Sequence, residues 1–210
     1  MGSPPATTLL VVALIAEALP LLKRLERARM LSPTLCAGLL AGQPVLLLRC
    51  GVGRRRAEQA TARVMAEHTV GRVLSLGTCG ALTDDLMVGA LVTAQTILDA
   101  SSDELDALTA HARPVVMATV PRVVDTADHR ARWAARGAQV CEMEAAGVLS
   151  AAAGHPFHTL KVVSDLAGAR APRIRGLPRS LRVTAFQLRA YRLVDQRLAP
   201  TLEAWLRSAR

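Results

Sequence analysis

Short runs of apolar residues alternate with longer amphipathic stretches along most of the chain. The apolar runs have the length and composition of buried β-strands, and Gly, Pro or polar residues bound them. The predicted strands cover residues 9–15, 44–49, 73–76, 89–96, 114–120, 123–124, 139–141 and 157–163. Helical spacing is found over residues 19–30, 54–67, 126–136, 145–153 and 179–207, the last interrupted by Pro200. This alternation predicts an α/β fold: a three-layer α/β/α sandwich with a central mixed, mostly parallel sheet.

Length and composition favour one domain with an aliphatic core. The 210 residues fit a single α/β domain over 1–210, because a chain of this size buries roughly 70% of its unfolded surface. Hydrophobic residues make up 51% of the chain but aromatic residues only 2%, so Ala, Val and Leu must fill the core. The polar character of residues 101–112 predicts a loop or a short helix. Residues 167–178 are rich in Gly, Ala, Pro and Arg, which is typical of a mobile loop.

Positive charge is concentrated at the C-terminal end. The chain has a net charge of +9, and residues 170–210 contain ten Arg against Asp195 and Glu203, a net of +8 that leaves +1 for residues 1–169. Such a basic segment is compatible with nucleic acid, an acidic membrane surface or an anionic partner, but we favour a solvated helix face. Aromatic residues that could stack on bases are few there. We therefore expect no nucleic-acid partner.

Cysteine spacing and the N-terminal run indicate a cytoplasmic protein. The four cysteines form no CxxC pair, so we expect reduced core thiols and no zinc site. They are Cys36, Cys50, Cys79 and Cys141. The apolar run 8–15 lacks a preceding basic region, and Glu17 ends it too early for a membrane span. We read this run as the first buried strand.

Carboxylates stand at the ends of predicted buried strands. Glu142-Met143-Glu144-Ala145 follows the strand 139–141, and Ser164-Asp165 follows the strand 157–163. A carboxylate in such a place is costly unless it is paired, hydrogen-bonded or bound to a ligand. One alternative is that Glu142 and Glu144 only favour the N-terminus of the helix 145–153. The other is a ligand site, since open α/β sheets bind ligands beyond the carboxyl ends of their strands.

The order of the strand-end motifs favours the ligand site. In sequence they are Glu17, Gly51-Val52-Gly53, Gly77-Thr78-Cys79-Gly80, Glu142-Met143-Glu144-Ala145 and Ser164-Asp165. This series resembles the purine/uridine phosphorylase superfamily, especially its nucleosidase branch (methylthioadenosine/S-adenosylhomocysteine nucleosidase-like), over about residues 8–168. The resemblance implies a nucleoside phosphorylase-like fold, a small-molecule nucleoside substrate and a homodimer or larger homo-oligomer. It implies no metal or organic cofactor.

The resemblance also implies cleavage of an N-glycosidic bond, with a role for each motif. Asp165 would donate a proton to N7 of a purine, and Glu17 would orient or deprotonate the attacking water. Glu144 would accept hydrogen bonds from the ribose hydroxyls, Met143 would pack under the sugar, and Thr78 would help to position water or sugar. The remaining expected substrate-binding residues are Glu142, Gly77, Ser164 and Gly53.

The nucleophile can be water or phosphate. Phosphorylases of the superfamily place an arginine two residues before the Gly-Ser/Thr-x-Gly turn, where this chain has Ser75. Loss of that guanidinium weakens the case for phosphate. Arg54 and Arg55 could still reach an anion at the start of their helix. We therefore expect a hydrolase that acts on a purine nucleoside or a 5′-substituted adenosine.

Two alternatives stay open. One is a phosphate-dependent phosphorylase. The other is a weakly active nucleoside-binding or interaction protein that works through its basic segment. Residues 119–123 contain no aromatic side chain to stack on a base, so we expect either an aliphatic base pocket or a substrate other than a simple adenine nucleoside.

Overall fold

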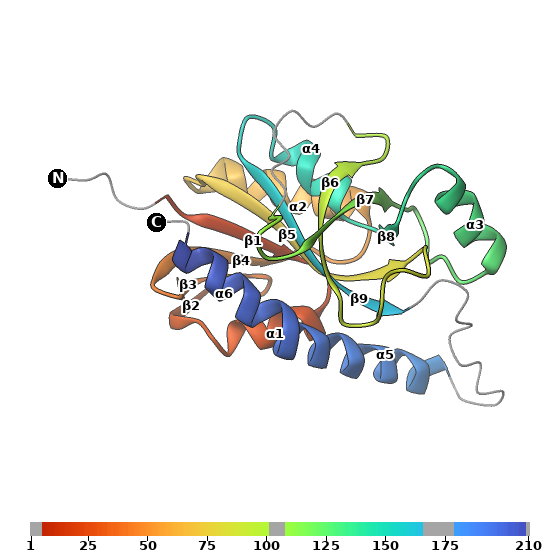
Figure 1. Ribbon diagram of the computed structural model, residues 1–210. Helices are drawn as coiled ribbons and strands as arrows, with labels where there is room; N and C mark the ends of the chain where they lie inside the picture. Colours follow the sequence, from red (N-terminus) through yellow and green to blue (C-terminus); the bar gives the residue numbers. More distant parts are fainter. Residues whose placement is uncertain (1–5, 101–107, 166–178, 209–210) are drawn as a thin grey trace.

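Among the described residues, nine strands form one mixed sheet (Figure 1). The structure of the protein is a computed structural model that describes residues 6–100, 108–165 and 179–208. The strands are β1 (Thr8–Val12), β2 (Glu26–Ser32), β3 (Leu35–Leu40), β4 (Gln43–Arg49), β5 (Arg72–Ala81), β6 (Leu91–Ile97), β7 (Arg113–Thr119), β8 (Val140–Glu142) and β9 (Phe157–Asp165). Their order is β2-β3-β4-β1-β5-β8-β7-β6-β9, and β9 also pairs with β5. The strands from β5 to β9 therefore close into a ring of pairings.

The sheet contains both parallel and antiparallel pairs. Parallel pairs join β4 to β1, β1 to β5, β5 to β9, and β6 and β8 to β7. Antiparallel pairs join β2 to β3, β3 to β4, β5 to β8, and β6 to β9. The predicted α/β fold with a central mixed sheet is confirmed, and most predicted strands are found within a few residues of their expected bounds.

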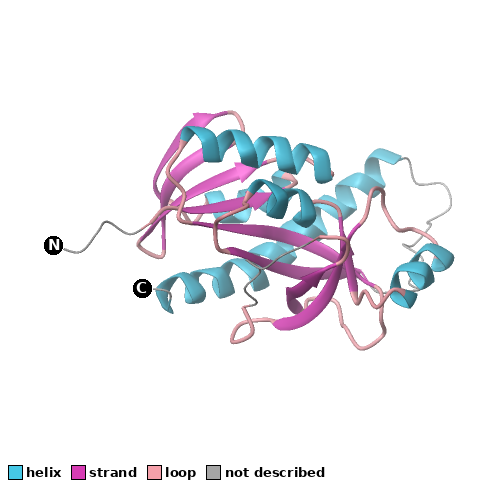
Figure 2. Cartoon of the chain, turned by 90° about the horizontal axis from the view of Figure 1, so that it is seen from above, coloured by secondary structure: helices cyan, strands magenta, loops and turns pink. Residues whose placement is uncertain are grey.

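Helices cover both faces of the sheet (Figures 1 and 2). They are α1 (Ile15–Leu22), α2 (Arg54–Glu67), α3 (Ala127–Ala135), α4 (Ala145–Ala151), α5 (Arg179–Leu193) and α6 (Ala199–Ser208). The sequence of β1 requires helices on both faces of the sheet. Leu9 and Val11 pack in the cluster that includes α2 and α4, whereas Leu10 and Val12 pack with α1 and α6. Successive side chains of a strand point to opposite faces, so an unbroken apolar run is buried on both.

The predicted helix over residues 19–30 is wrong. Its first part belongs to α1, which ends at Leu22, and its second part is β2. β3, which pairs with β2, was not predicted. β2 is an edge strand with almost every residue exposed, and its pairing with β3 contains register shifts. An exposed, charged edge strand lacks the apolar alternation that identifies a strand, and charged residues protect such edges from further pairing.

The basic C-terminal segment is part of the fold where the structure describes it. α5 passes into α6 through a π-helical turn, Val194–Leu198, so the predicted break at Pro200 is absent from the described segment. Pro200 lies in the first turn of α6. The preceding π-helical turn accommodates its missing N–H, since such turns already depart from the regular hydrogen-bond ladder. Val194, Leu198 and Leu202 are fully buried against the sheet.

Two further observations bear on the sequence predictions. All four cysteines are free thiols, and Cys36, Cys50 and Cys79 are buried as expected.

Within the described part of the chain, no helix has both the length and the apolar character needed to cross a membrane. The predicted loop over residues 167–178 and most of the polar stretch 101–112 lie outside the described residues.

Candidate active site

A cavity of about 280 Å³ opens where the carboxyl ends of β1, β5, β8 and β9 converge. Its lining includes seven of the residues predicted from the sequence, which come from segments far apart in the chain. They are Glu17, Thr78, Glu142, Met143, Glu144, Ser164 and Asp165. Gly53 and Gly77 are not among the lining residues, but the backbone N–H of Gly53 donates to Glu144 and Gly77 lies against the carboxylate of Glu17. Val52, Val120, Val123, Val124 and Phe186 add apolar surface.

Glu17 is held by four hydrogen bonds in the first turn of α1. Its Oε1 accepts from the backbone N–H of Thr78 at 2.8 Å and from the Thr78 hydroxyl at 3.0 Å. Its Oε2 accepts from the N–H groups of Ala13 at 3.2 Å and Leu14 at 3.0 Å. Gly77 makes this approach possible, because a Cβ there would lie 2.7 Å from Oε1 and its φ is +127°. The carboxylate therefore has a fixed position in the cavity.

Glu142 and Glu144 are two residues apart but have different surroundings. Glu142 Oε2 accepts from the N–H groups of Glu144 at 2.9 Å and Ala145 at 2.7 Å, and Oε1 accepts from the Thr119 hydroxyl at 2.6 Å. Glu142 thus stabilises the N-terminus of α4, as the helix alternative proposed. Both carboxylate oxygens of Glu142 therefore accept hydrogen bonds from protein groups.

Glu144 turns towards the start of α2. Its Oε1 accepts from the backbone N–H of Gly53 at 2.8 Å, and the residue is 8% exposed. Burial, followed by the charge of Glu142, raises the pKa of Glu144 to about 7. The positive charge of Lys161 and the Gly53 hydrogen bond act in the opposite direction. Glu144 is therefore a buried acceptor whose charge depends on pH near neutrality.

Lys161 is a residue of this site that the sequence interpretation did not single out. It lies in β9 and is 2% exposed. Its Nζ donates to the Leu76 carbonyl at 3.0 Å and lies 3.4 Å from Glu142 Oε2. Burial lowers the pKa of Lys161, but the charges of Glu142, Glu144 and Glu17 outweigh this effect and leave the pKa raised. The available signal was a charged residue inside the apolar run 157–163.

Asp165 ends β9 as one partner of an ion pair. Its Oδ2 accepts from Arg130 Nη2 at 2.6 Å, and its Oδ1 accepts from the Ser164 hydroxyl at 2.9 Å. Arg130 comes from α3 and is 9% exposed, whereas the Asp165 side chain is 39% exposed. Gly80 leaves room for this carboxylate, since a Cβ there would lie 3.3 Å from Oδ2. No pattern in the sequence pointed to Arg130.

Three valines give part of the cavity an aliphatic lining. Val120, Val123 and Val124 line it, and Met143 packs against the apolar cluster that contains Val120 and Val124. This agrees with the absence of aromatic residues from 119–123. Phe186 of α5 also lines the cavity, although nothing in its sequence context had assigned it to the site.

The model of one protein family, the phosphorylase superfamily, matches residues 6–121, which is more than half of the chain. The chain belongs to the phosphorylase superfamily. The matched segment contains Glu17 and the Gly51–Gly53 and Gly77–Gly80 turns, whereas Glu142–Ala145 and Ser164-Asp165 lie beyond it. The resemblance stated from the motifs is thus confirmed at the level of the superfamily.

Individual relatives and solved structures agree with this assignment. A 5′-methylthioadenosine/S-adenosylhomocysteine nucleosidase of Shewanella piezotolerans is 33% identical over 61 residues, which span 29% of this chain and 26% of that protein. The match thus covers about a quarter of the curated relative.

Solved structures match over nearly the whole chain. The Colwellia psychrerythraea nucleosidase in complex with adenine has a TM-score of 0.77 at 19% identity, with 96% of both chains covered. The futalosine hydrolase of Helicobacter pylori has a TM-score of 0.74 at 18% identity, with 95% of this chain and 98% of that one covered. At these identities the similarity establishes the fold.

Proposed function

We propose that the protein is a nucleosidase that hydrolyses the N-glycosidic bond of a purine nucleoside or a 5′-substituted adenosine. The products are the free base and the ribosyl fragment. The observation that carries the proposal is that Glu17, Glu144 and Asp165, which come from distant segments, line one cavity. The nucleosidase relative and the nucleosidase and hydrolase structures of the same fold support it.

Each carboxylate has a position suited to one part of the reaction. Water attacks C1′ of the ribose, the C1′–N9 bond breaks, and its electron pair leaves with the base. Glu17, fixed by four donors, orients the water and takes its proton, while Glu144 accepts hydrogen bonds from the ribose hydroxyls. Asp165 delivers a proton to N7 of the departing base. Met143 supports the sugar from its apolar side.

Arg130 adds a requirement to the acid step. Asp165 is paired with Arg130 through Oδ2, so in this proposal that contact loosens in the complex before Asp165 gives a proton to N7. In this proposal Arg130 and Ser164 position Asp165 when the cavity is empty.

The lining of the cavity favours water over phosphate as the nucleophile. Holding a phosphate dianion needs a guanidinium or ammonium group within contact distance. None of the described residues that line the cavity is an arginine or a lysine, and Lys161 and Arg130, which contact lining residues, are paired with the carboxylates of Glu142 and Asp165. Arg54 and Arg55, the sequence candidates for an anion, are exposed at the start of α2 and are not among those lining residues. Phosphorolysis is therefore the second candidate.

Base release from a panel of nucleosides tests the proposal. The panel contains adenosine, inosine, methylthioadenosine, adenosylhomocysteine and futalosine, each assayed with and without inorganic phosphate. We expect release without phosphate and no stimulation by it. Strict dependence on phosphate would establish a phosphorylase instead. If the folded protein binds nucleosides but releases no base from any of them, the binding-protein alternative holds.

We also propose that the protein works in the cytoplasm as a homodimer or larger homo-oligomer. Large apolar side chains are exposed on α1, at Ile15 and Leu19, and near β6, at Met87 and Val88. Exposed apolar groups of this kind are typical of subunit contacts. Free thiols fit a reducing compartment. Light scattering coupled to size-exclusion chromatography measures the subunit number, and a monomer at micromolar concentration would exclude this assembly.

A further inference from the structure

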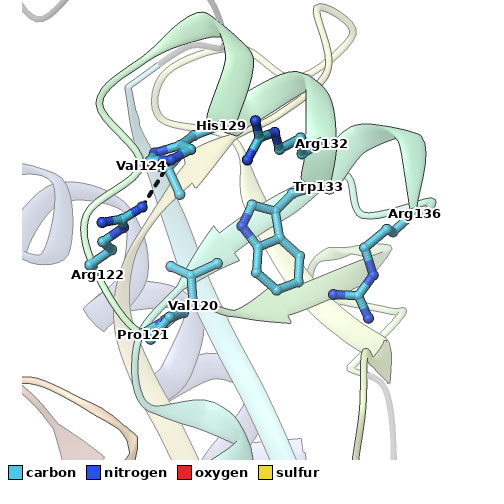
Figure 3. Close-up of a pocket in the computed structure, with 8 residues that line it drawn as sticks. All are labelled: Val120, Pro121, Arg122, Val124, His129, Arg132, Trp133 and Arg136. Atoms are coloured by element: carbon cyan, nitrogen blue, oxygen red, sulfur yellow. Dashed lines mark hydrogen bonds between the residues drawn. The ribbon is translucent and has the colours of Figure 1, made fainter.

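A second cavity lies beside the candidate active site. It also measures about 280 Å³, and Val120 and Val124 line both cavities (Figure 3). The rest of its lining comes from the loop before α3 and from α3 itself. Figure 3 shows the indole of Trp133 facing Val120, with arginine side chains arranged around it. None of the roles proposed above for the nucleosidase reaction uses this cavity.

The lining carries positive charge beside an apolar wall. Arg122, Arg132 and Arg136 contribute three guanidinium groups, and none of the described residues that line the cavity is acidic. The Arg136 guanidinium lies 4.7 Å from the centre of the Trp133 ring, and it also pairs with Asp99 outside the lining. Guanidinium groups that line one cavity concentrate anions and match the geometry of carboxylates and phosphates.

The arrangement of these groups follows from the spacing along α3. His129, Arg132, Trp133 and Arg136 are related by steps of three and four residues, which places them on one face of the helix. The Thr126 hydroxyl accepts from the His129 N–H at 3.3 Å and caps the helix. Trp133 packs against the apolar cluster of Val120, Val124 and Ala138, so the ring has a supported position.

His129 connects this face to the loop before the helix. Its Nε2 lies 3.1 Å from Arg122 Nη2. In that contact the guanidinium group can only donate, so Nε2 of His129 is the acceptor. An anion near Arg122 would receive one donor from the loop and others from α3, which brings two segments onto the same ligand.

We propose that this cavity is a second binding site, for a small planar aromatic anion. The aromatic ring would lie on the apolar wall formed by Val120, Val124 and Trp133, because aromatic and aliphatic surfaces pack well on an indole. The carboxylate or phosphate group would be held by Arg122 and Arg132. Both halves of the ligand are needed, since an anion alone leaves the apolar wall unused and a neutral ring leaves the guanidinium groups without a partner.

The two tryptophans of the chain make a direct test possible. In the ¹⁵N-labelled protein, Trp133 and Trp205 each give one indole N–H signal, and Trp133→Phe assigns them. The probe is benzoate, with benzamide as the neutral ring and acetate as the anion without a ring. Benzoate should move the Trp133 signal saturably, with a dissociation constant on the order of 1 mM, as expected for a fragment of this size. The Trp205 signal should stay in place.

Controls separate this site from general anion binding. Benzamide and acetate should each bind about tenfold more weakly than benzoate, a difference of about 1.4 kcal/mol. Arg132→Ala should weaken benzoate binding by a similar factor, whereas Arg63→Ala, which removes an exposed arginine of α2, should not change it. Phenyl phosphate, compared with benzoate, shows which acid group the site prefers.

Several outcomes would overturn the inference. These are no saturable movement of the Trp133 signal, equal responses to all three probes, or equal effects of the two arginine variants. The titration does not involve turnover, so its failure is distinct from failure of the proposed nucleosidase activity. Arg132 is exposed, and its replacement is expected to leave the fold intact.

Discussion

Replacing Lys161 by Met tests whether its ammonium group compensates the charge of the buried carboxylates beside the cavity. The ammonium group of Lys161 is 3.4 Å from Glu142 Oε2, and both side chains are almost fully buried, at 2% and 1% exposure. Removing one partner of a buried ion pair typically costs about 3–5 kcal/mol, because the other charge is left without compensation. Met has a similar length and flexibility, so the packing loss is small. We therefore expect the free energy of unfolding to fall by about 3–5 kcal/mol at neutral pH.

The assay is urea denaturation followed by circular dichroism, with Lys23→Met as the matched control. Lys23 is the only other lysine of the chain, and it lies at the surface next to Tyr191. Its replacement should leave the free energy of unfolding unchanged. The double variant Lys161→Met/Glu142→Gln should recover much of the loss, because it removes the uncompensated charge. The difference from the unaltered protein should also shrink at acidic pH, where carboxylates take up protons.

Equal midpoints for the two lysine variants would refute this reasoning. So would a double variant less stable than Lys161→Met alone, since the loss would then come from packing and not from charge. Base release by the same proteins adds a second measurement. We expect Lys161→Met to lower turnover even where it is folded, because Glu144 then loses the positive charge that opposes the rise of its pKa.

Three further predictions concern the other carboxylates. Gly77→Ala should lower the free energy of unfolding by about 2–3 kcal/mol and turnover on the order of 100-fold, because the added Cβ would displace Glu17. The control is Gly137→Ala, whose Cβ would meet nothing within 4 Å at φ +87°. In denaturation experiments it should cost only about 1 kcal/mol, and it should keep full turnover. Asp165→Asn should reduce base release by about 10²–10⁴-fold while the circular dichroism spectrum stays the same, and unchanged turnover would exclude Asp165 as the acid. The pKa of Glu144 is about 7 in the folded protein and 4.5 ordinarily, so its protonation stabilises the fold below pH 4.5, and this contribution is lost as pH rises to 7. Glu144→Gln should therefore flatten the dependence of the free energy of unfolding on pH in this range, measured by denaturation. Parallel pH profiles of the two proteins would contradict the raised pKa of Glu144.

The sequence by itself determined the fold class and the place of the candidate site. The unbroken apolar run of β1 requires burial on both faces, and that requirement predicts a strand covered by helices. Motifs at the carboxyl ends of buried strands meet at one edge of the sheet, and this rule predicts Glu17, Glu144 and Asp165 in one cavity. Hydrophobic periodicity and the order of motifs along a strand are local properties, so they can be identified from one amino-acid sequence.

The tertiary structure alone decided which groups pair with each carboxylate. Glu142 caps α4 while Glu144 turns to the N–H of Gly53, which is 91 residues away, and nothing in their shared motif distinguishes them. Arg130 pairs with Asp165 only because α3 passes the end of β9. The edge strand β2 was missed because its exposed residues carry no apolar alternation. Hydrogen bonds and ion pairs depend on which distant segments meet, and the pattern of hydrophobic residues records burial but not partners.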